Sequence, residues 1–163
     1  MTAKAYAEQV KIELADTWLP LIYSERILKM RTRSYNFGAL HGKPRVEIQH
    51  TLLGVELNVG HRRLLCPDLA TARYLAVFAR VGCQDVAVPY DITKVSLLAD
   101  ELESSWHRML LLADYKAAER TEVFRARIHG LLIAKLRGEI AAAGAGTPVP
   151  EFKQSTKQLA QGT

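Results

Sequence analysis

The sequence has few cysteines and no long hydrophobic run, and each shortage narrows what the chain can be. The two cysteines, Cys66 and Cys83, lack the close spacing of a zinc site or a disulfide framework. They predict buried, reduced thiols in an intracellular setting. No stretch approaches the ~20 apolar residues that cross a bilayer, so no membrane contact is expected. Residues 1–16 carry both charge signs without the apolar centre of a signal peptide, which predicts a soluble cytoplasmic protein.

The motifs of common enzyme classes are missing as well. The sequence has no glycine-rich phosphate loop, no G-x-S-x-G elbow and no recognisable pairing of a cysteine nucleophile with histidine. The five histidines are scattered, and no two stand at the spacing by which a helix presents metal ligands. No catalytic residue, metal site or cofactor is predicted, and the question of enzymatic activity stays open.

What the sequence does contain is the composition of an ordinary globular protein. Its 163 residues are 48% hydrophobic and 24% charged, enough for one core without disulfide or metal support. We predict a single α+β domain over residues 1–143. Residues 144–163 hold two prolines and few large apolar side chains, which predicts a flexible tail.

Residues 45–52 alternate between apolar and polar side chains, which is the period of half-buried strands. In this first strand the apolar residues up to Leu52 share the buried face, where His50 is expected as a hydrogen-bonded core residue. The same alternation returns over residues 55–59, and residues 62–66 are expected to form a short third strand. Three consecutive strands favour an antiparallel meander.

A helix with one apolar face follows this meander. Asp68 can accept a hydrogen bond from a free N–H of the first turn, and Gly82 tolerates the left-handed conformation that ends many helices. The valine-rich run over residues 85–89 then predicts a buried strand that joins the same sheet and stops at Pro89.

Helical periodicity dominates both ends of the chain. It predicts an amphipathic helix over residues 3–18, a second helical piece over 21–30, and a loop over 34–44. From residue 93 to 143 an apolar stripe follows a helical pattern, with a polar gap over 114–122. The gap indicates either a kink between two packed helices or one helix of about 75 Å, whose outer half needs a partner.

These elements predict an α+β fold with a small, mostly antiparallel sheet, made of the three-strand meander plus one strand after a helix. An N-terminal helix and a long C-terminal helical region pack against it. The apolar stripe of that C-terminal region exceeds what one small sheet can cover, so it predicts a surface for self-association or a protein partner. The residues expected in this interface are Trp106, Phe124, Ile128 and Leu132.

One part of the sequence lacks acidic residues altogether. Residues 26–46 hold six lysines and arginines, and two aromatic residues, Tyr35 and Phe37, interrupt the run. Cationic side chains displace the counterions of nucleic acid, and aromatic rings stack on exposed bases. The residues expected to contact nucleic acid, two of them on the third strand, are Arg31, Arg33, Lys43, Arg45, Arg62 and Arg63.

The order helix, three strands, helix, strand over residues 3–89 resembles the core of the PD-(D/E)XK nucleases. That family carries an acid on one strand and an acid-x-Lys on the next, which hold a divalent cation and polarise the scissile phosphate. Here Glu47 and Glu56 fall on neighbouring strands, but Asn58 stands where the lysine belongs. The resemblance therefore implies a nuclease-like scaffold without a complete metal site, and no catalytic residue is carried over.

Two functions are consistent with these features. The first is a non-enzymatic protein-interaction or self-associating module, a homo-oligomer joined through its C-terminal helices. The alternative is a nucleic-acid-binding protein on the nuclease-like scaffold, for which the net charge of +5 and the pI of about 9.3 give only modest support. Neither function needs a cofactor.

Overall fold

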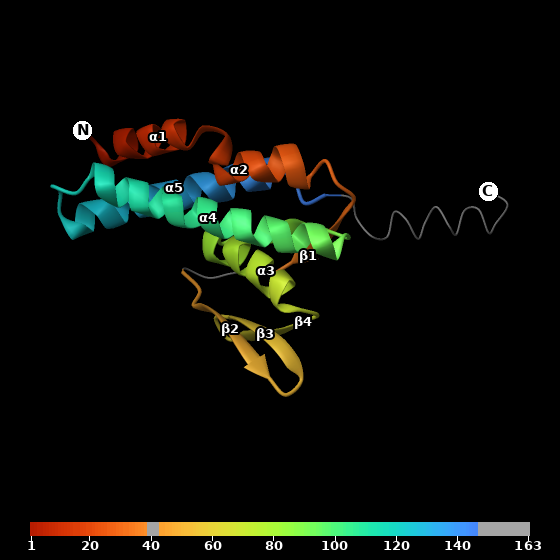
Figure 1. Ribbon diagram of the computed structural model, residues 1–163. Helices are drawn as coiled ribbons and strands as arrows, with labels where there is room; N and C mark the ends of the chain where they lie inside the picture. The colour runs from red at the N-terminus through yellow and green to blue at the C-terminus, as the bar shows by residue number, and fades with distance from the viewer. Residues whose placement is uncertain (39–42, 147–163) are drawn as a thin grey trace.

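The computed structural model describes residues 1–38 and 43–146, so most of the predicted tail lies outside the described residues. In chain order the elements are α1 (Ala3–Leu14), the 3₁₀ turn η1 (Ala15–Thr17), α2 (Leu19–Ile22), the π-helical turn η2 (Tyr23–Ile27), β1 (Thr32–Asn36), β2 (Val46–Thr51), β3 (Gly54–Val59), β4 (Arg62–Cys66), α3 (Leu69–Val81), β5 (Asp85–Pro89), α4 (Ile92–Lys116) and α5 (Glu122–Ala143). Helices α1, α4 and α5 pack together in one layer, α3 lies beneath them, and β2, β3 and β4 project from the far side of α3 (Figure 1).

The predicted α+β fold is confirmed, and both of its sheets are antiparallel. Strands β2, β3 and β4 form the predicted meander, in which Thr51 pairs with Gly54 and Val59 with Arg62. One face of the meander packs on α3, where Leu57 and Val59 are buried. This face is the inner face of the meander.

Strand β5 joins a different partner from the one expected. It pairs with β1, from Thr32 opposite Pro89 to Asn36 opposite Asp85, and these two strands form a sheet of their own. The sequence predicts a loop over most of β1, because its residues are polar except for Tyr35 and show no clear apolar period. Since β5 and the meander share no sheet, the four-strand arrangement that the nuclease resemblance implies does not form in the described residues.

Helix α3 forms as predicted. Asp68 Oδ1 accepts a hydrogen bond from Thr71 N at 2.7 Å, and Gly82 ends the helix with a φ of 91°. Most of the helix is buried between α4 and the inner face of the meander. Helix α3 therefore attaches the strands to the helical layer.

The C-terminal region consists of two packed helices rather than one long helix. Helix α4 ends at Lys116, and Thr121 caps α5 by accepting a hydrogen bond from Phe124 N at 3.1 Å. Helix α5 then runs back along α4 and also contacts α1, α2 and α3 (Figure 1). The apolar stripe of α5 is buried in these contacts, and its residues are Ile128, Leu132, Leu136 and Ile140.

A tyrosine in η2 ties the end of α5 to β5. The hydroxyl of Tyr23 donates a hydrogen bond to Gly144 O at 2.5 Å and accepts one from Ala87 N at 3.0 Å. Burial raises the pKa of Tyr23 to about 12, so the hydroxyl stays protonated and able to donate. The residues that follow α5 are thereby held against the β1–β5 sheet.

Replacing Gly146 with alanine at this contact should destabilise the protein. A Cβ on Gly146 would overlap Thr32 Oγ1 and lie 3.0 Å from Ala87 Cβ, and the residue has a φ of 81°. Because both the overlap and the left-handed backbone oppose a side chain, we expect Gly146→Ala to lower the free energy of unfolding by about 1–3 kcal/mol. Urea unfolding followed by circular dichroism measures this change.

Gly138→Ala is the matched control for this substitution. Gly138 lies within α5, and a Cβ there meets no atom within 4 Å. Alanine favours a helix over glycine by up to about 1 kcal/mol, so this variant should be slightly more stable than the wild type. An unfolding midpoint of Gly146→Ala equal to that of the wild type would show that residues 144–146 are not held against the sheet.

Candidate functional site

The residues expected in a partner interface belong to the interior of a single chain. Trp106 is 9% exposed, and Ile128 and Leu132 are each 0% exposed. Phe124 is half-buried, with its ring edge-on to Tyr6 at 5.7 Å between centroids. The interface is expected only if the small sheet alone covers the stripe. In the structure the other helices cover the stripe. The stripe is therefore not available to a partner, and the reason for placing an interface on it is removed.

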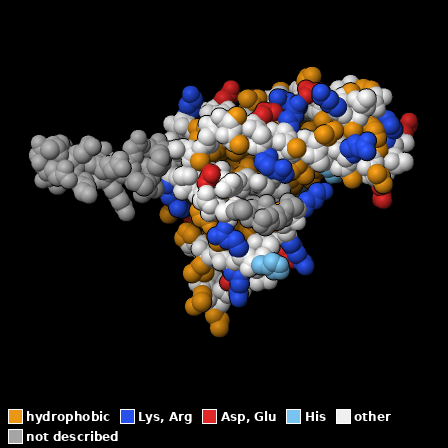
Figure 2. All heavy atoms as spheres, turned by 180° about the vertical axis from the view of Figure 1, so that it is seen from behind, with side chains coloured by type: hydrophobic (Ala, Val, Ile, Leu, Met, Phe, Trp, Pro, Cys, Tyr) orange, Lys and Arg blue, Asp and Glu red, His pale blue; other side chains and the backbone are white. Residues whose placement is uncertain are grey.

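An apolar surface lies instead at the free end of the meander, where the sequence pattern does not predict one. Leu52 and Leu53 are 107% and 85% exposed, and Leu65 and Leu69 are 64% and 42% exposed. We call these four residues the leucine end. Figure 2 shows hydrophobic side chains gathered on this projecting part of the molecule. The predictions that Leu52 and His50 lie on a buried strand face are wrong, because both residues are exposed.

The turn between β2 and β3 does not itself require leucines. Leu53 N donates to Thr51 Oγ1 at 3.2 Å, the Thr51 hydroxyl donates to Gly54 O at 3.1 Å, and Gly54 supplies a positive φ of 129°. Turn centres favour Gly, Pro, Asn, Asp and Ser, whereas leucine makes no bond to the backbone and places an apolar side chain in water. Leu65 extends the same surface, since its Cδ1 lies 3.9 Å from the position of a Cβ on Gly54.

The six residues expected to contact nucleic acid lie in different surroundings in the structure. Arg31 lies over the ring of Tyr90, 5.1 Å from its centroid, and Lys43 is exposed. Two other arginines form ion pairs on the meander face turned away from α3, which neutralise their charge locally. These pairs are Arg45 with Glu47 at 2.7 Å and Arg63 with Glu56 at 3.0 Å.

The remaining two arginines, Arg33 and Arg62, both act electrostatically on Tyr35. Burial raises the pKa of Tyr35, and the positive charges of Arg62 and Arg33 oppose that rise, so both guanidinium groups act on the same hydroxyl. Arg62 Nη1 lies 2.6 Å from the position of a Cβ on Gly38, which places its guanidinium against the backbone just after β1. The structure thus brings together two basic residues that lie 29 positions apart in the sequence.

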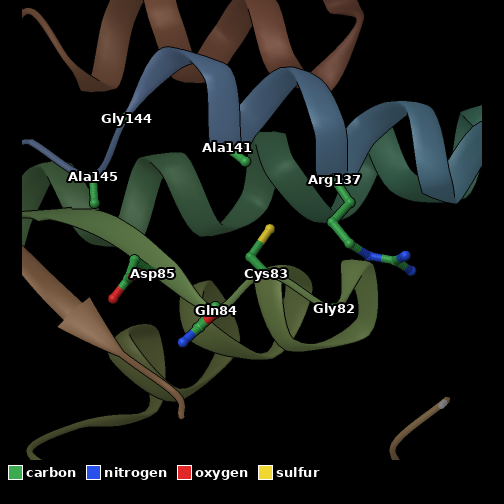
Figure 3. Close-up of a pocket in the computed structure, with 8 residues that line it drawn as sticks. All are labelled: Gly82, Cys83, Gln84, Asp85, Arg137, Ala141, Gly144 and Ala145. Carbon is green, nitrogen blue, oxygen red and sulfur yellow. The ribbon is translucent and has the colours of Figure 1, made fainter. Parts of the chain in front are cut away.

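A hollow of about 490 Å³ lies between the end of α5 and the segment from Gly82 to Asp85 (Figure 3). The thiol of Cys83 points toward α5 at Ala141, and Arg137 extends from α5 toward Gly82. The carboxylate of Asp85 points away from α5 and accepts a hydrogen bond from an asparagine of β1 at 2.5 Å. General acid–base catalysis requires side chains that converge on one reacting group. These three polar side chains do not converge in that way.

The thiol in this hollow is not an activated nucleophile. Burial raises the pKa of Cys83 to about 12 and outweighs the opposing charge of Arg137. Cys66 is buried too, so the predicted burial of both cysteines is confirmed. In residues 1–38 and 43–146, no group of three His, Cys, Asp or Glu side chains could hold a metal ion. Within the same residues, no helix has the length and apolar character to cross a membrane.

Leu132→Ala should destabilise the protein equally at every protein concentration. Leu132 is a core residue of one chain, so its truncation should lower the free energy of unfolding by about 2–5 kcal/mol. Leu131, its neighbour at 39% exposed, provides the control, and Leu131→Ala should cost much less. Urea unfolding at several protein concentrations measures both. A loss of stability that grew on dilution would place Leu132 in a contact between chains instead.

The buried thiol also predicts a loss of stability in alkaline solution. The pKa of Cys83 is raised from 9.0 to about 12, so above pH 9 the unfolded chain releases a proton that the folded chain retains. Stability should therefore fall as pH rises through this window, by at most about 1.4 kcal/mol per pH unit for one group. Urea unfolding at a series of pH values measures the slope, which should be shallower in Cys83→Ala. Equal slopes in the variant and the wild type would contradict this assignment.

The sites described above come from the contacts of this chain alone. No family model, no curated protein and no solved structure matches it.

Proposed function

We propose that this chain is a non-enzymatic interaction protein that self-associates through the leucine end of its meander. The observation that carries the proposal is the exposure of Leu52 and Leu53, at 107% and 85%, in a turn that requires neither side chain. Together with Leu65 and Leu69, they expose about as much surface as three isolated leucines. Exposed apolar side chains gathered on a projecting element are typical of an interaction site.

A second copy of the same chain suits this surface. All four side chains of the leucine end are apolar, so they would bind a partner by their burial and not by hydrogen bonds of their own. A two-fold axis through it would place the same four leucines of each copy against one another and remove them from water. Among the described residues, no strand pairs with the outer edge of β2 or of β4. A second copy that approaches the meander is therefore not blocked by a further strand.

The charge of the chain does not oppose this contact. Two copies that each carry +5 repel one another where their basic residues face each other. On the meander the basic residues concentrate at the opposite end of the strands, where Gly60 N bonds to Arg45 O at 2.8 Å beside Arg62. A strand of six residues places the turn of Leu52 and Leu53 about 17–20 Å from that end, well beyond the Debye length of about 8 Å in physiological salt.

Replacing Leu52 and Leu53 with serine should convert the associated protein into a monomer. Burial of one leucine contributes about 1.5–3 kcal/mol, so L52S/L53S should raise the dissociation constant by about 100-fold or more. The melting temperature of the monomer should not change, because both side chains already lie in water. Sedimentation equilibrium over a range of protein concentrations measures the association.

The control is a variant that removes similar exposed apolar surface elsewhere. Leu111 and Val123 are 68% and 77% exposed on the helical layer, and L111S/V123S should associate like the wild type. A wild-type protein that remains monomeric at high concentration would refute the proposal. Equal loss of association in the two double variants would show that exposed apolar area in general, and not the leucine end, drives it.

A further inference from the structure

We infer a second binding site, in which Arg33, Tyr35 and Arg62 hold a phosphate group of a single-stranded nucleic acid. This site lies where β1 approaches the start of β4. It is at the other end of the meander from the leucine end, and it does not depend on self-association.

Two strands from different sheets bring the three side chains together. Arg33 and Tyr35 are two residues apart in β1, so they lie on the same face of that strand. Arg62 is the first residue of β4, and its guanidinium occupies the space that glycine leaves at Gly38. The absence of a side chain at Gly38 thus lets Arg62 reach β1.

The ring of Tyr35 is fixed at this junction. It packs edge-on to Phe37, with 5.0 Å between centroids and 72° between planes, and Phe37 is 1% exposed. Burial raises the pKa of Tyr35, so its hydroxyl is protonated at neutral pH and donates a hydrogen bond. The Tyr35 hydroxyl and the guanidinium groups of Arg33 and Arg62 are thus three groups that can donate hydrogen bonds to an anion.

Neither Arg33 nor Arg62 has an acidic partner within the described residues. The carboxylates of the meander, Glu47 and Glu56, pair with other arginines, and residues 26–46 contain no acid. Guanidinium groups form paired hydrogen bonds with the oxygens of a phosphate, and two of them beside one donor hydroxyl offer positive charge and several donors to one such group.

A strand of nucleic acid fits the surroundings better than a free phosphate ion. Residues 26–46 contain no acidic residue, so this segment brings no negative charge to repel the neighbouring phosphates of a strand. Figure 2 shows blue side chains distributed over this part of the molecule. A single strand can also lay a base against an aromatic ring such as Tyr35, which a duplex with stacked bases cannot do.

Fluorescence anisotropy with a labelled oligothymidylate tests the site. Arg33→Ala/Arg62→Ala should weaken binding at low salt by about tenfold or more, since it removes two phosphate contacts. It should also reduce the slope of log affinity against log salt by about 0.7, since each phosphate of a single strand that is neutralised contributes about 0.7. Tyr35→Phe keeps every charge, so it should weaken binding severalfold and leave the slope unchanged.

Arg45→Ala/Arg63→Ala is the matched control. It removes the same charge from the same part of the chain, but from arginines that already pair with glutamates, so its affinity should stay close to that of the wild type. Equal loss in the two double variants would overturn the site, because binding would then follow net charge alone. Thermal melting of each variant checks that its fold is intact.

Competition distinguishes the sources of the phosphate. Inorganic phosphate should displace the strand only in large excess, and a duplex of the same length should bind more weakly than the strand. Phosphate that competes as well as the strand, or a duplex that binds more tightly, would overturn the assignment to a single strand. Failure of the wild type to bind the strand at low salt would overturn the site as a whole.

Discussion

The fold depends on one constraint, which is that the apolar stripe of α5 has to be covered. The chain covers it with its own helices: α5 contacts α1, α2, α3 and α4, and the four stripe residues are at most 1% exposed. Polar contacts flank this core, where Lys11 bonds to Glu139 at 3.0 Å and Trp18 Nε1 donates to the same carboxylate at 2.9 Å. Ion pairs at the surface contribute little to stability, so the burial of the stripe is the main term.

The helices bury their apolar stripe against one another and leave scattered apolar side chains exposed, among them Leu111 and Val123, whereas the meander exposes two adjacent leucines at its turn. Helix α3 covers only its inner face, and β2 and β4 remain edge strands among the described residues. The opposite face is polar, with Arg63 paired to Glu56, and such a face is stable in water. The leucine end has no such explanation within the chain. It is therefore the surface on which function is most reasonably sought.

The elements that the sequence predicts correctly are those with local causes. Asp68 and Gly82 mark the two ends of α3, and a positive φ of 60° at Gly60 makes the second turn of the meander. The pairing of β1 with β5 joins segments about 50 residues apart, and no local pattern reports it. The polar gap before α5 was visible, but the choice between a kinked and a straight helix depends on tertiary contacts that periodicity does not contain.

The candidate sites show the same difference between what local sequence indicates and what depends on tertiary contacts. The basic residues could be listed from the sequence, but only the structure distinguishes the paired Arg45 and Arg63 from the Arg33 and Arg62 beside Tyr35. The leucine end does leave a signal in the sequence, because Leu53 breaks the alternation of the first strand directly before a glycine. Alternation alone extends the strand to Leu52, whereas the glycine that follows is typical of a two-residue turn.

The two proposed sites lie at opposite ends of the same strands, and this arrangement has a physical consequence. Contact between two copies at Leu52 and Leu53 would leave both arginine sites uncovered, because about 17–20 Å of strand separates that turn from Arg62. A pair of chains would then present two phosphate sites on one particle. A strand long enough to reach both would bind the second site as an intramolecular step, so its affinity would exceed that of a single site without any new contact. Self-association and phosphate binding are therefore separate in mechanism, yet the first would strengthen the second.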